Sequence, residues 1–242
     1  MERTFELLEL MADAGGEVAL TQLAEQSALP LPTIHRIMRT LVAGGYVRQQ
    51  PSRRYALGPR LIRLGETAGR TLGAWATPYL AGLTQAIGET ASLAVLDGDQ
   101  VVYVAQVPSQ HSMRIFTEVG RRVDVHSTAA GKAVLAHLPA AEVDQLLARA
   151  GMRQQAERTV VDRAGLHREL AAIRERGYAE DDGEQEVGVR SIAVSVPGAP
   201  AGTAISISGP AARMSRVEVT DVVPLMRRVA GQLAKELAAT RH

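Results

Sequence analysis

The chain has 242 residues, a length typical of two domains, and 46% of them are hydrophobic, enough for a sizeable core. It contains no cysteine, which excludes disulfides, thiolate catalysis and thiolate-ligated metals. The net charge of +1 excludes a strongly basic nucleic-acid coat but not a local basic face. No apolar run approaches the ~20 residues of a membrane span, and no secretory leader pattern opens the chain. We therefore expect a cytoplasmic protein.

The first segment, residues 1–58, has the pattern of a DNA-binding winged helix-turn-helix. A short helix begins at Leu20, a break follows at residues 27–30, and a second helix begins at Leu31. Proline is tolerated in the first turn of a helix, because its missing N–H would be unpaired there anyway. Apolar residues recur at three-four spacing on one side of the second helix, and the other side is polar. A hairpin with a basic tip follows at residues 46–57, and this combination is typical of a unit that grips a duplex.

The polar side of the second helix and the hairpin supply the predicted DNA contacts. Arg36 and Arg39 would enter the major groove, where arginine pairs with guanine O6 and N7. The hairpin arginines would engage phosphates or the minor groove and set the register. For each arginine the alternative is an ion pair within the protein or a solvated side chain. The predicted DNA-binding residues are Pro32, Thr33, His35, Arg36, Arg39, Arg48, Arg53 and Arg54.

The second segment, residues 59–73, is predicted to be a linker helix. Its apolar residues, Leu61, Ile62, Leu64 and Ala68, are spaced as one stripe of an amphipathic helix. A helix this small, lying between two domains, cannot bury such a stripe alone. Packing against a second copy of itself solves the problem, so we expect a homo-oligomer.

The third segment, residues 74–242, mixes helix and strand patterns, which predicts an α+β domain with helices flanking a mostly antiparallel sheet. Two late strands form a hairpin whose branched aliphatic residues share one face and whose Ser and Ala residues share the other. The Ser/Ala face could simply face solvent, but it lacks charge, which favours the floor of a cavity. Helices are expected over residues 78–87, 141–150, 165–176 and 221–239, and strands over 91–96, 101–106, 191–196 and 203–208.

Two clusters could close over that floor. Ser127 or Thr128 can cap a helix that begins near Ala129, whose free N–H groups favour an anion. The pair Gly131-Lys132 does not make a phosphate-binding loop, because the leading glycine and the final Ser or Thr of that motif are missing. The acidic run at residues 180–186 is interpreted most simply as a solvated loop.

Other chemistry has little support in the residues. The histidines are scattered without a metal-binding helical spacing, and the acidic run lacks the calcium-loop pattern, so we expect no metal site. No Ser/His/Asp arrangement rises above chance, and no cofactor motif is evident. A hydrolase using Asp181 or Ser208, an architectural DNA binder without a ligand, and a protein-interaction module remain as alternatives.

The chain resembles the IclR family of bacterial transcriptional regulators over essentially its whole length. No single motif is specific to this family, but the order and spacing of the motifs together are. The matching motifs are LPLPTIHR at residues 29–36, YALG at 55–58, HSTAAGKA at 126–133, RGY at 176–178, EVGVRSIA at 186–193 and AISISGP at 204–210.

The resemblance implies a winged helix-turn-helix, residues 1–58, joined by a linker helix, residues 59–73, to a GAF-like effector-binding domain, residues 74–242. Such proteins are dimers or dimers of dimers on palindromic operators. A small metabolite, often a carboxylate, changes their operator affinity. Repression is the default activity that we expect for the chain. We expect no enzymatic activity, no cofactor and no metal.

The resemblance also implies an effector site. The serines at 206 and 208 are singled out independently by the strand alternation. Position 191 is Ser where some relatives have Cys, so ligand specificity cannot be inherited. Hydroxy-, keto- and ureido-acids are the first candidates, and Phe116 leaves an aromatic acid open. The implied effector-binding residues are Ile115, Val123, Ala129, Ala130, Asp181, Ser191, Ser206 and Ser208.

Overall fold

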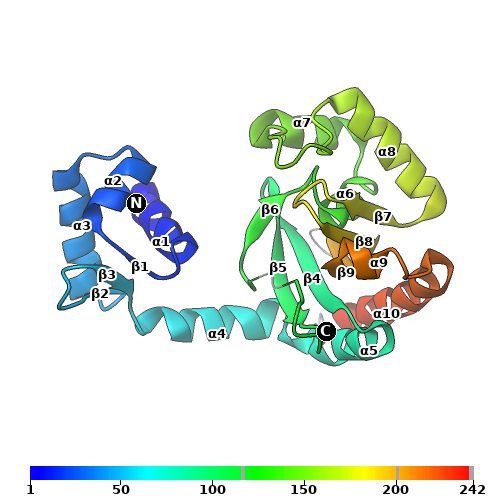
Figure 1. Cartoon of the computed structure of the whole chain (residues 1–242), viewed down its shortest axis with the longest axis horizontal. Coiled ribbons are helices and arrows are strands. Elements are labelled where there is room, and N and C mark those ends of the chain that lie inside the picture. Colours follow the sequence, from blue (N-terminus) through cyan, green and yellow to red (C-terminus); the bar gives the residue numbers. More distant parts are fainter. Residues whose placement is uncertain (116–117, 200–201, 240–242) are drawn as a thin grey trace. The chain divides into compact units, whose positions relative to one another are not determined.

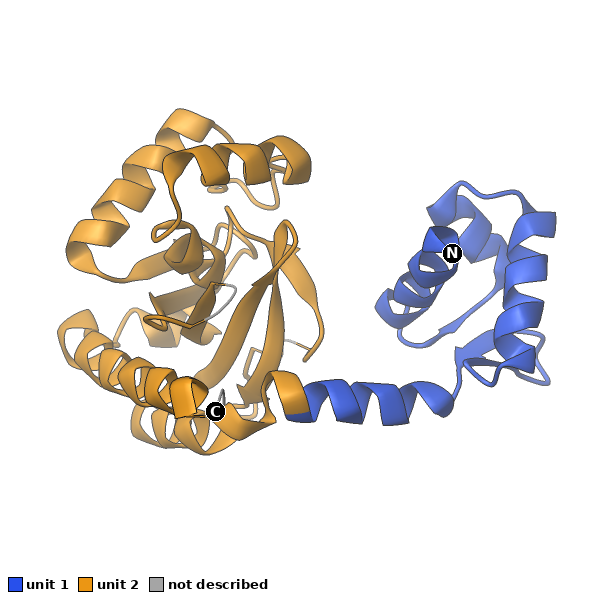
Figure 2. Ribbon diagram, turned by 180° about the vertical axis from the view of Figure 1, so that it is seen from behind, with its two compact units in different colours: residues 1–70 blue, residues 71–242 orange. Residues whose placement is uncertain are grey.

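The computed structural model describes residues 1–115, 118–199 and 202–239 (Figure 1). It divides into two compact units, residues 1–70 and residues 71–242 (Figure 2). The sequence-based boundaries at residues 58 and 73 flank the linker helix, whereas the compact units divide inside that helix. The effector candidate Phe116 lies outside the described residues.

Unit 1 is a winged helix-turn-helix, as predicted. The helices α1 to α3 pack around an apolar core that includes Leu7, Leu23 and Ile34. The wing is a small antiparallel sheet in the order β1-β3-β2. The elements are α1 (Glu2–Asp13), β1 (Glu17–Val18), α2 (Leu20–Ser27), α3 (Leu31–Ala43), β2 (Val47–Gln49) and β3 (Tyr55–Leu57).

Helix α3 owes its position to one buried stripe. Ile34, Met38 and Leu41 are buried at three-four spacing, which holds the helix against the core and turns its polar residues outward. Pro32 stands in the first turn, where no intrahelical N–H bond is lost. The turn before α3 contains Ala28 in the left-handed region, at φ 53°, which lets the two helices meet at a sharp angle.

The linker helix α4 (Arg60–Leu72) has none of its residues buried. Ile62 is 62% exposed and Leu64 is 47% exposed, although both belong to the predicted apolar stripe. A stripe of this kind in water is unfavourable by roughly 25 cal/mol per Å² of apolar surface. The single chain therefore leaves the stripe without the cover that the sequence pattern predicts.

Unit 2 is built on one six-stranded antiparallel sheet in the order β6-β5-β4-β9-β8-β7. The four strands predicted from the sequence form its centre. The strands are β4 (Thr90–Asp97), β5 (Gln100–Val107), β6 (Arg122–Asp124), β7 (Ala179–Asp182), β8 (Val189–Ser195) and β9 (Thr203–Pro210). The helices are η1 (Ala74–Ala76), α5 (Thr77–Ile87), α6 (Ala129–Leu135), α7 (Ala140–Ala150), α8 (Arg163–Arg176), α9 (Ala211–Met214) and α10 (Val219–Ala239).

The two faces of this sheet carry different cores, so the α+β prediction is confirmed. The face with Ile192 and Ile205 packs with residues of α5 and α10. The face with Ala193 and Ala204 packs with residues of α6, α7 and α8. Helix α6 can approach that face closely because the strand residues beneath it are small. Figure 1 shows these helices on opposite sides of the sheet.

Two edge strands were missed by the sequence patterns. Strand β6 has only three residues. Strand β7 consists of Ala179–Asp182 and has an acidic composition that is depleted in strands. The interpretation of residues 180–186 as a solvated loop is therefore wrong in its first part, since Asp181 is buried in the sheet. None of the described helices combines the length and the hydropathy that a bilayer crossing requires.

Gly131 sets the distance between α6 and the segment before it. A Cβ at this position would overlap the carbonyl oxygen of Val125. We expect Gly131→Ala to lower the free energy of unfolding of unit 2 by about 1–3 kcal/mol, because the backbone would have to shift in a packed core. Urea unfolding measures this change. The control is Gly231→Ala in α10, where a Cβ meets nothing within 4 Å, and an equal loss in both variants would contradict the argument.

Candidate DNA-binding and effector sites

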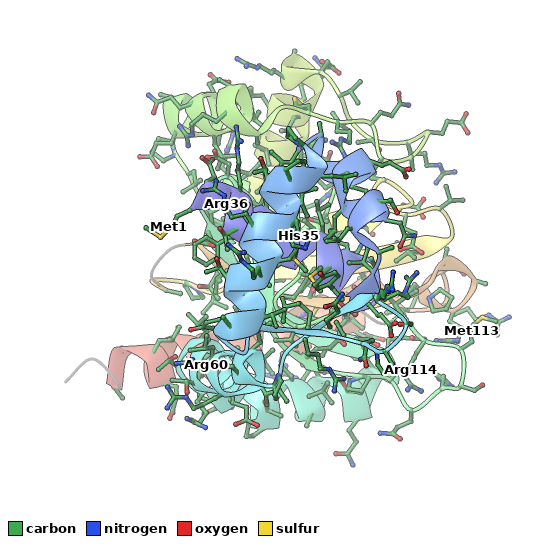
Figure 3. All side chains as sticks on the ribbon, turned by 90° about the vertical axis from the view of Figure 1, so that its left-hand side faces the viewer. Met1, His35, Arg36, Arg60, Met113 and Arg114 are labelled. Carbon is green, nitrogen blue, oxygen red and sulfur yellow. The ribbon has the colours of Figure 1, made fainter. Side chains whose placement is uncertain are left out.

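The outer surface of α3 carries the predicted reading residues. His35, Arg36 and Arg39 are exposed, Pro32 is exposed and Thr33 is half-buried. Figure 3 looks onto α3, with His35 and Arg36 labelled on it. Within the described ranges, no ion pair engages Arg36 or Arg39. Both guanidinium groups are thus available to an external acceptor.

The wing arginines differ from one another. Arg48 and Arg53 are exposed on the hairpin. Arg54, in contrast, is held within unit 1: its Nη2 donates to Glu17 O at 3.2 Å and to Gln22 Oε1 at 3.3 Å, and its Nε lies 3.4 Å from Glu17 Oε1. The intramolecular alternative is realised for Arg54, because it leaves the hairpin toward β1 and α2. The set of free wing arginines is therefore smaller than the sequence pattern suggested.

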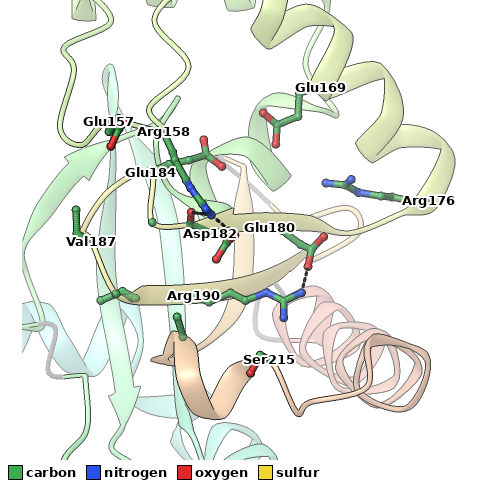
Figure 4. Close-up of a pocket in the computed structure, with 14 residues that line it drawn as sticks. Glu157, Arg158, Glu169, Arg176, Glu180, Asp182, Glu184, Val187, Arg190 and Ser215 are labelled. Carbon is green, nitrogen blue, oxygen red and sulfur yellow. Dashed lines mark hydrogen bonds and ion pairs between the residues drawn. The ribbon is translucent and has the colours of Figure 1, made fainter.

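A hollow with a volume of about 710 Å³ in unit 2 is lined by residues of β7, β8, α8 and α9 (Figure 4). We call it the acidic groove, because five carboxylates and three arginines line it. Arg158 pairs with Asp182 at 2.5 Å, and Arg190 pairs with Glu180 at 2.7 Å. Two of the three arginines that line the groove are thus already paired with its own carboxylates, so they are not available to bind an organic acid.

A smaller cavity, of about 60 Å³, lies at one end of the Ser/Ala face of the sheet. Ser208 on β9 stands opposite Thr90 on β4 and opposite Ser191 on β8. Ser191 in turn stands opposite Asp181 on β7. A polar row thus crosses four strands. We call this the serine cavity, and it is lined by Tyr103, Ile115, Arg121, Val123, Thr128, Asp181, Gln185, Glu186, Val189, Ser191 and Ser208.

Five of the eight predicted effector residues meet in the serine cavity. Ile115 is held over the floor by its carbonyl, which accepts a hydrogen bond of 3.0 Å from the Thr90 hydroxyl. Val123 on β6 forms an apolar wall. The five residues brought together are Ile115, Val123, Asp181, Ser191 and Ser208.

The other three predicted residues do not line the cavity. Ser206 lies two residues further along β9, in the row opposite Ser92 and Ala193, and is buried. Ala129 and Ala130 open α6 and are each 1% exposed, since the whole helix is packed. In this structure no open path therefore leads from the cavity to these three residues. That they touch a ligand stays a prediction. The Ser206 hydroxyl nevertheless has no hydrogen-bond partner among the described residues.

Sequence reasoning missed Tyr103, Arg121 and Gln185. Tyr103 lies on β5, and its backbone N–H donates to Arg121 O at 3.2 Å. Gln185 Oε1 accepts a hydrogen bond of 2.6 Å from Ser127, which leaves its amide N–H groups for a ligand. Thr128, not Ser127, caps α6 by accepting from Gly131 N at 3.2 Å. The alternation of β5 could have indicated Tyr103, but no local pattern indicates the other two.

A buried ion cluster supports the cavity wall. Lys132 Nζ lies 2.6 Å from Glu169 Oε1 on α8 and 2.5 Å from Glu184 Oε1 in the loop after β7. Lys132 is fully buried. Burial raises the pKa of Glu184 to about 7, although the charge of Lys132 acts in the opposite direction. Lys132 is thus a structural cation that ties this loop to α6 and α8.

Two side chains that line the serine cavity have shifted pKa values. Burial raises the pKa of Asp181 to about 6, although its Oδ1 accepts hydrogen bonds from Glu184 N at 2.8 Å and Gln185 N at 3.3 Å and Lys132 is near. Burial raises the pKa of Tyr103 to about 12, with a further contribution from Asp181. The tyrosine therefore stays a hydrogen-bond donor at neutral pH.

A helix-turn-helix with exposed arginines on its second helix, joined to a domain with a polar cavity, defines the class of DNA-binding transcriptional regulators. Residues 1–51 match the IclR helix-turn-helix domain. Residues 67–235 match the family described as bacterial transcriptional regulator IclR C-terminal. The chain belongs to the IclR family of bacterial transcriptional regulators. Members of this family are DNA-binding regulators and not enzymes.

Individual relatives span nearly the whole chain. The transcriptional repressor IclR of Escherichia coli is 35% identical over 244 residues, which cover 96% of this chain and 88% of that protein. The acetate operon repressor of Salmonella typhimurium is 34% identical, over 100% of this chain and 90% of that protein. The crystal structure of an IclR-type regulator from Alicyclobacillus acidocaldarius has a TM-score of 0.81 at 28% identity, over 96% of both chains. An IclR homologue from Microbacterium hydrocarbonoxydans shares the fold, with a TM-score of 0.81 at 24% identity over 98% of both chains.

The raised pKa of Asp181 predicts a pH-dependent cost in stability. The folded state holds this proton above the ordinary pKa of 3.8, so the stability from Asp181 is fully present below pH 3.8 and is lost as pH rises through about 6. Asp181→Asn keeps the acceptor oxygen and cannot ionise. We expect its free energy of unfolding to exceed that of the parent by on the order of 1–3 kcal/mol at pH 7.5 and to converge with it at about pH 3, below the ordinary pKa of 3.8. Urea titrations at both pH values measure this difference, and a gap independent of pH would disprove the assignment.

Proposed function

We propose that this protein is a transcriptional repressor in the cytoplasm whose operator affinity is changed by a small organic acid bound in the serine cavity. The observation that carries the proposal is a cavity rich in hydrogen-bond donors in a chain that also presents free arginines on a reading helix. Ser191, Ser208 and Tyr103 supply hydroxyl donors, and Gln185 supplies an amide. Hydrogen bonds from such donors to a charged acceptor are stronger than those to a neutral one, which favours an anion over a neutral molecule.

The buried hydroxyl of Ser206 supports a ligand in this part of the fold. A buried polar atom without a partner costs about 1–3 kcal/mol, and the Ser206 hydroxyl is in this state within the described chain. A ligand would recover that cost only if the packed start of α6 moved away from Ser206, because Ser206 does not line the serine cavity in this structure. The homologue from Microbacterium hydrocarbonoxydans was crystallised with 4-hydroxybenzoate, an organic acid.

The assignment as a repressor follows the relatives in Escherichia coli and Salmonella typhimurium, both of which are named repressors. A dimer is part of the proposal, because α4 leaves its apolar stripe exposed in the single chain. Two copies of α3 related by a twofold axis fit a palindromic operator. A ligand changes operator affinity only if it binds one arrangement of the dimer better than another.

Arg36 is proposed to contact the operator through the major groove. We expect Arg36→Ala to weaken specific binding by roughly 5- to 150-fold, since one bidentate contact to guanine is worth about 1–3 kcal/mol. An electrophoretic mobility shift on the native upstream region measures the affinity. Arg168→Ala, an exposed arginine on α8, is the control. Unchanged affinity in Arg36→Ala, with an unchanged melting temperature, would remove Arg36 from the reading surface.

Ser208 is proposed to bind the effector at the cavity floor. Among keto-, hydroxy-, ureido- and aromatic acids, we expect at least one to raise the melting temperature, by an amount equivalent to roughly 2.7 kcal/mol at a ligand concentration ~100 times Kd. The same acid should shift operator affinity in the mobility assay. Ser208→Ala should lose the stabilisation. Ser195→Ala, on the same face of β8 but outside the cavity, should keep it. Stabilisation that survives in Ser208→Ala would place the ligand elsewhere.

A further inference from the structure

A second polar hollow adjoins the serine cavity. It has a volume of about 350 Å³ and shares Arg121, Val123 and Gln185 with the cavity. We call it the arginine vestibule, because three of its lining residues are arginines and only one is a carboxylate. Its remaining lining residues are Gln100, Arg122, Asp124, Ala150, Arg153 and Gln155.

Two of the three arginines keep an uncompensated charge. Arg122 is neutralised by Asp97, with Nη1 2.5 Å from Oδ2 and Nη2 donating to Asp97 O at 2.7 Å. In the ranges that the structure describes, Arg121 and Arg153 enter no ion pair. The one carboxylate, Asp124, accepts a hydrogen bond of 2.7 Å from Gln155. The vestibule therefore offers a net positive site for an anion.

Arg121 links the vestibule to the cavity. Val101 pairs with Val123, and Val102 pairs with Arg122, in the ladder between β5 and β6. Side chains alternate along a strand, so Arg121 shares the cavity face with Val123, whereas Arg122 turns toward Asp97. A ligand that fills the cavity and extends outward meets the Arg121 guanidinium first.

We propose that the effector is a dicarboxylate, with one carboxylate on the serine cavity floor and the other on Arg121 and Arg153 in the vestibule. This inference rests on the proposed function. The cavity of about 60 Å³ holds roughly four water-sized groups at 10–15 Å³ each, which is one carboxylate and a short piece of carbon chain. The rest of a longer acid must occupy the vestibule, where a guanidinium binds a carboxylate through two hydrogen bonds.

The experiment compares diacids with probes of the same skeleton that carry one charge. The intact protein is titrated by calorimetry with succinate, glutarate and 2-oxoglutarate, and with monomethyl succinate and 2-oxopentanoate. We expect at least one diacid to bind tenfold or more tightly than its singly charged partner. That ratio should fall to near one in Arg121→Ala and should fall less in Arg153→Ala. Arg158→Ala, in the acidic groove, should leave it unchanged.

Each outcome separates this inference from the proposed function. Equal affinity for diacids and monoacids, with binding lost in Ser208→Ala, would overturn the inference that the effector is a dicarboxylate. The proposed function as an effector-binding regulator would then still stand. A preference for diacids that persists in Arg121→Ala would overturn the assignment of the second carboxylate to the vestibule. Loss of diacid binding in Arg158→Ala would move the site to the acidic groove. Binding of none of the five probes would overturn the dicarboxylate, and the broader panel of acids would then decide the proposed function.

Discussion

The buried pairing of Lys132 with Glu169 and Glu184 is the interaction on which the ligand-binding unit depends. It joins α6 and α8 to the loop after β7, and residues of that loop line the serine cavity. Removing one partner of a buried ion pair typically costs about 3–5 kcal/mol, because the remaining charge stays in a low dielectric. The same loop brings Gln185 to the cavity and donates two backbone N–H groups to Asp181. The same ion cluster therefore stabilises the fold and holds the loop that contributes to the cavity.

Much of the architecture could be predicted from the sequence. The helix-turn-helix followed from the three-four spacing of α3, and the central hairpin followed from the alternation in residues 191–208. Both are local periodicities that a single chain displays directly. The α+β class followed because the same segment combined strand and helix periods. Strand β7 was missed because its acidic residues are not typical of a strand. Its strand conformation depends on pairing with β8 and on the burial of Asp181.

The candidate site was only partly accessible to sequence reasoning. Ser206 and Ser208 were indicated by alternation, but alternation alone could not show which end of the Ser/Ala face α6 covers. Ser206 lies beneath the packed part, and Ser208 lies at the open end. Lys132 stood in a glycine-lysine pair that had no phosphate-binding context, and its true partners are 37 and 52 residues away. Contacts at that separation leave no trace in a local pattern.

The division of the sheet into a branched face and a small-residue face also shapes how such a protein can diversify. The Ile/Val face holds the core against α5 and α10, whereas the floor of the cavity lies on the opposite side of the same strands. A substitution on the floor alters cavity shape and hydrogen bonding without entering the apolar core that packs against α5 and α10. One scaffold can thus change its ligand specificity through single substitutions on β8 and β9. The DNA-binding unit need not change at the same time.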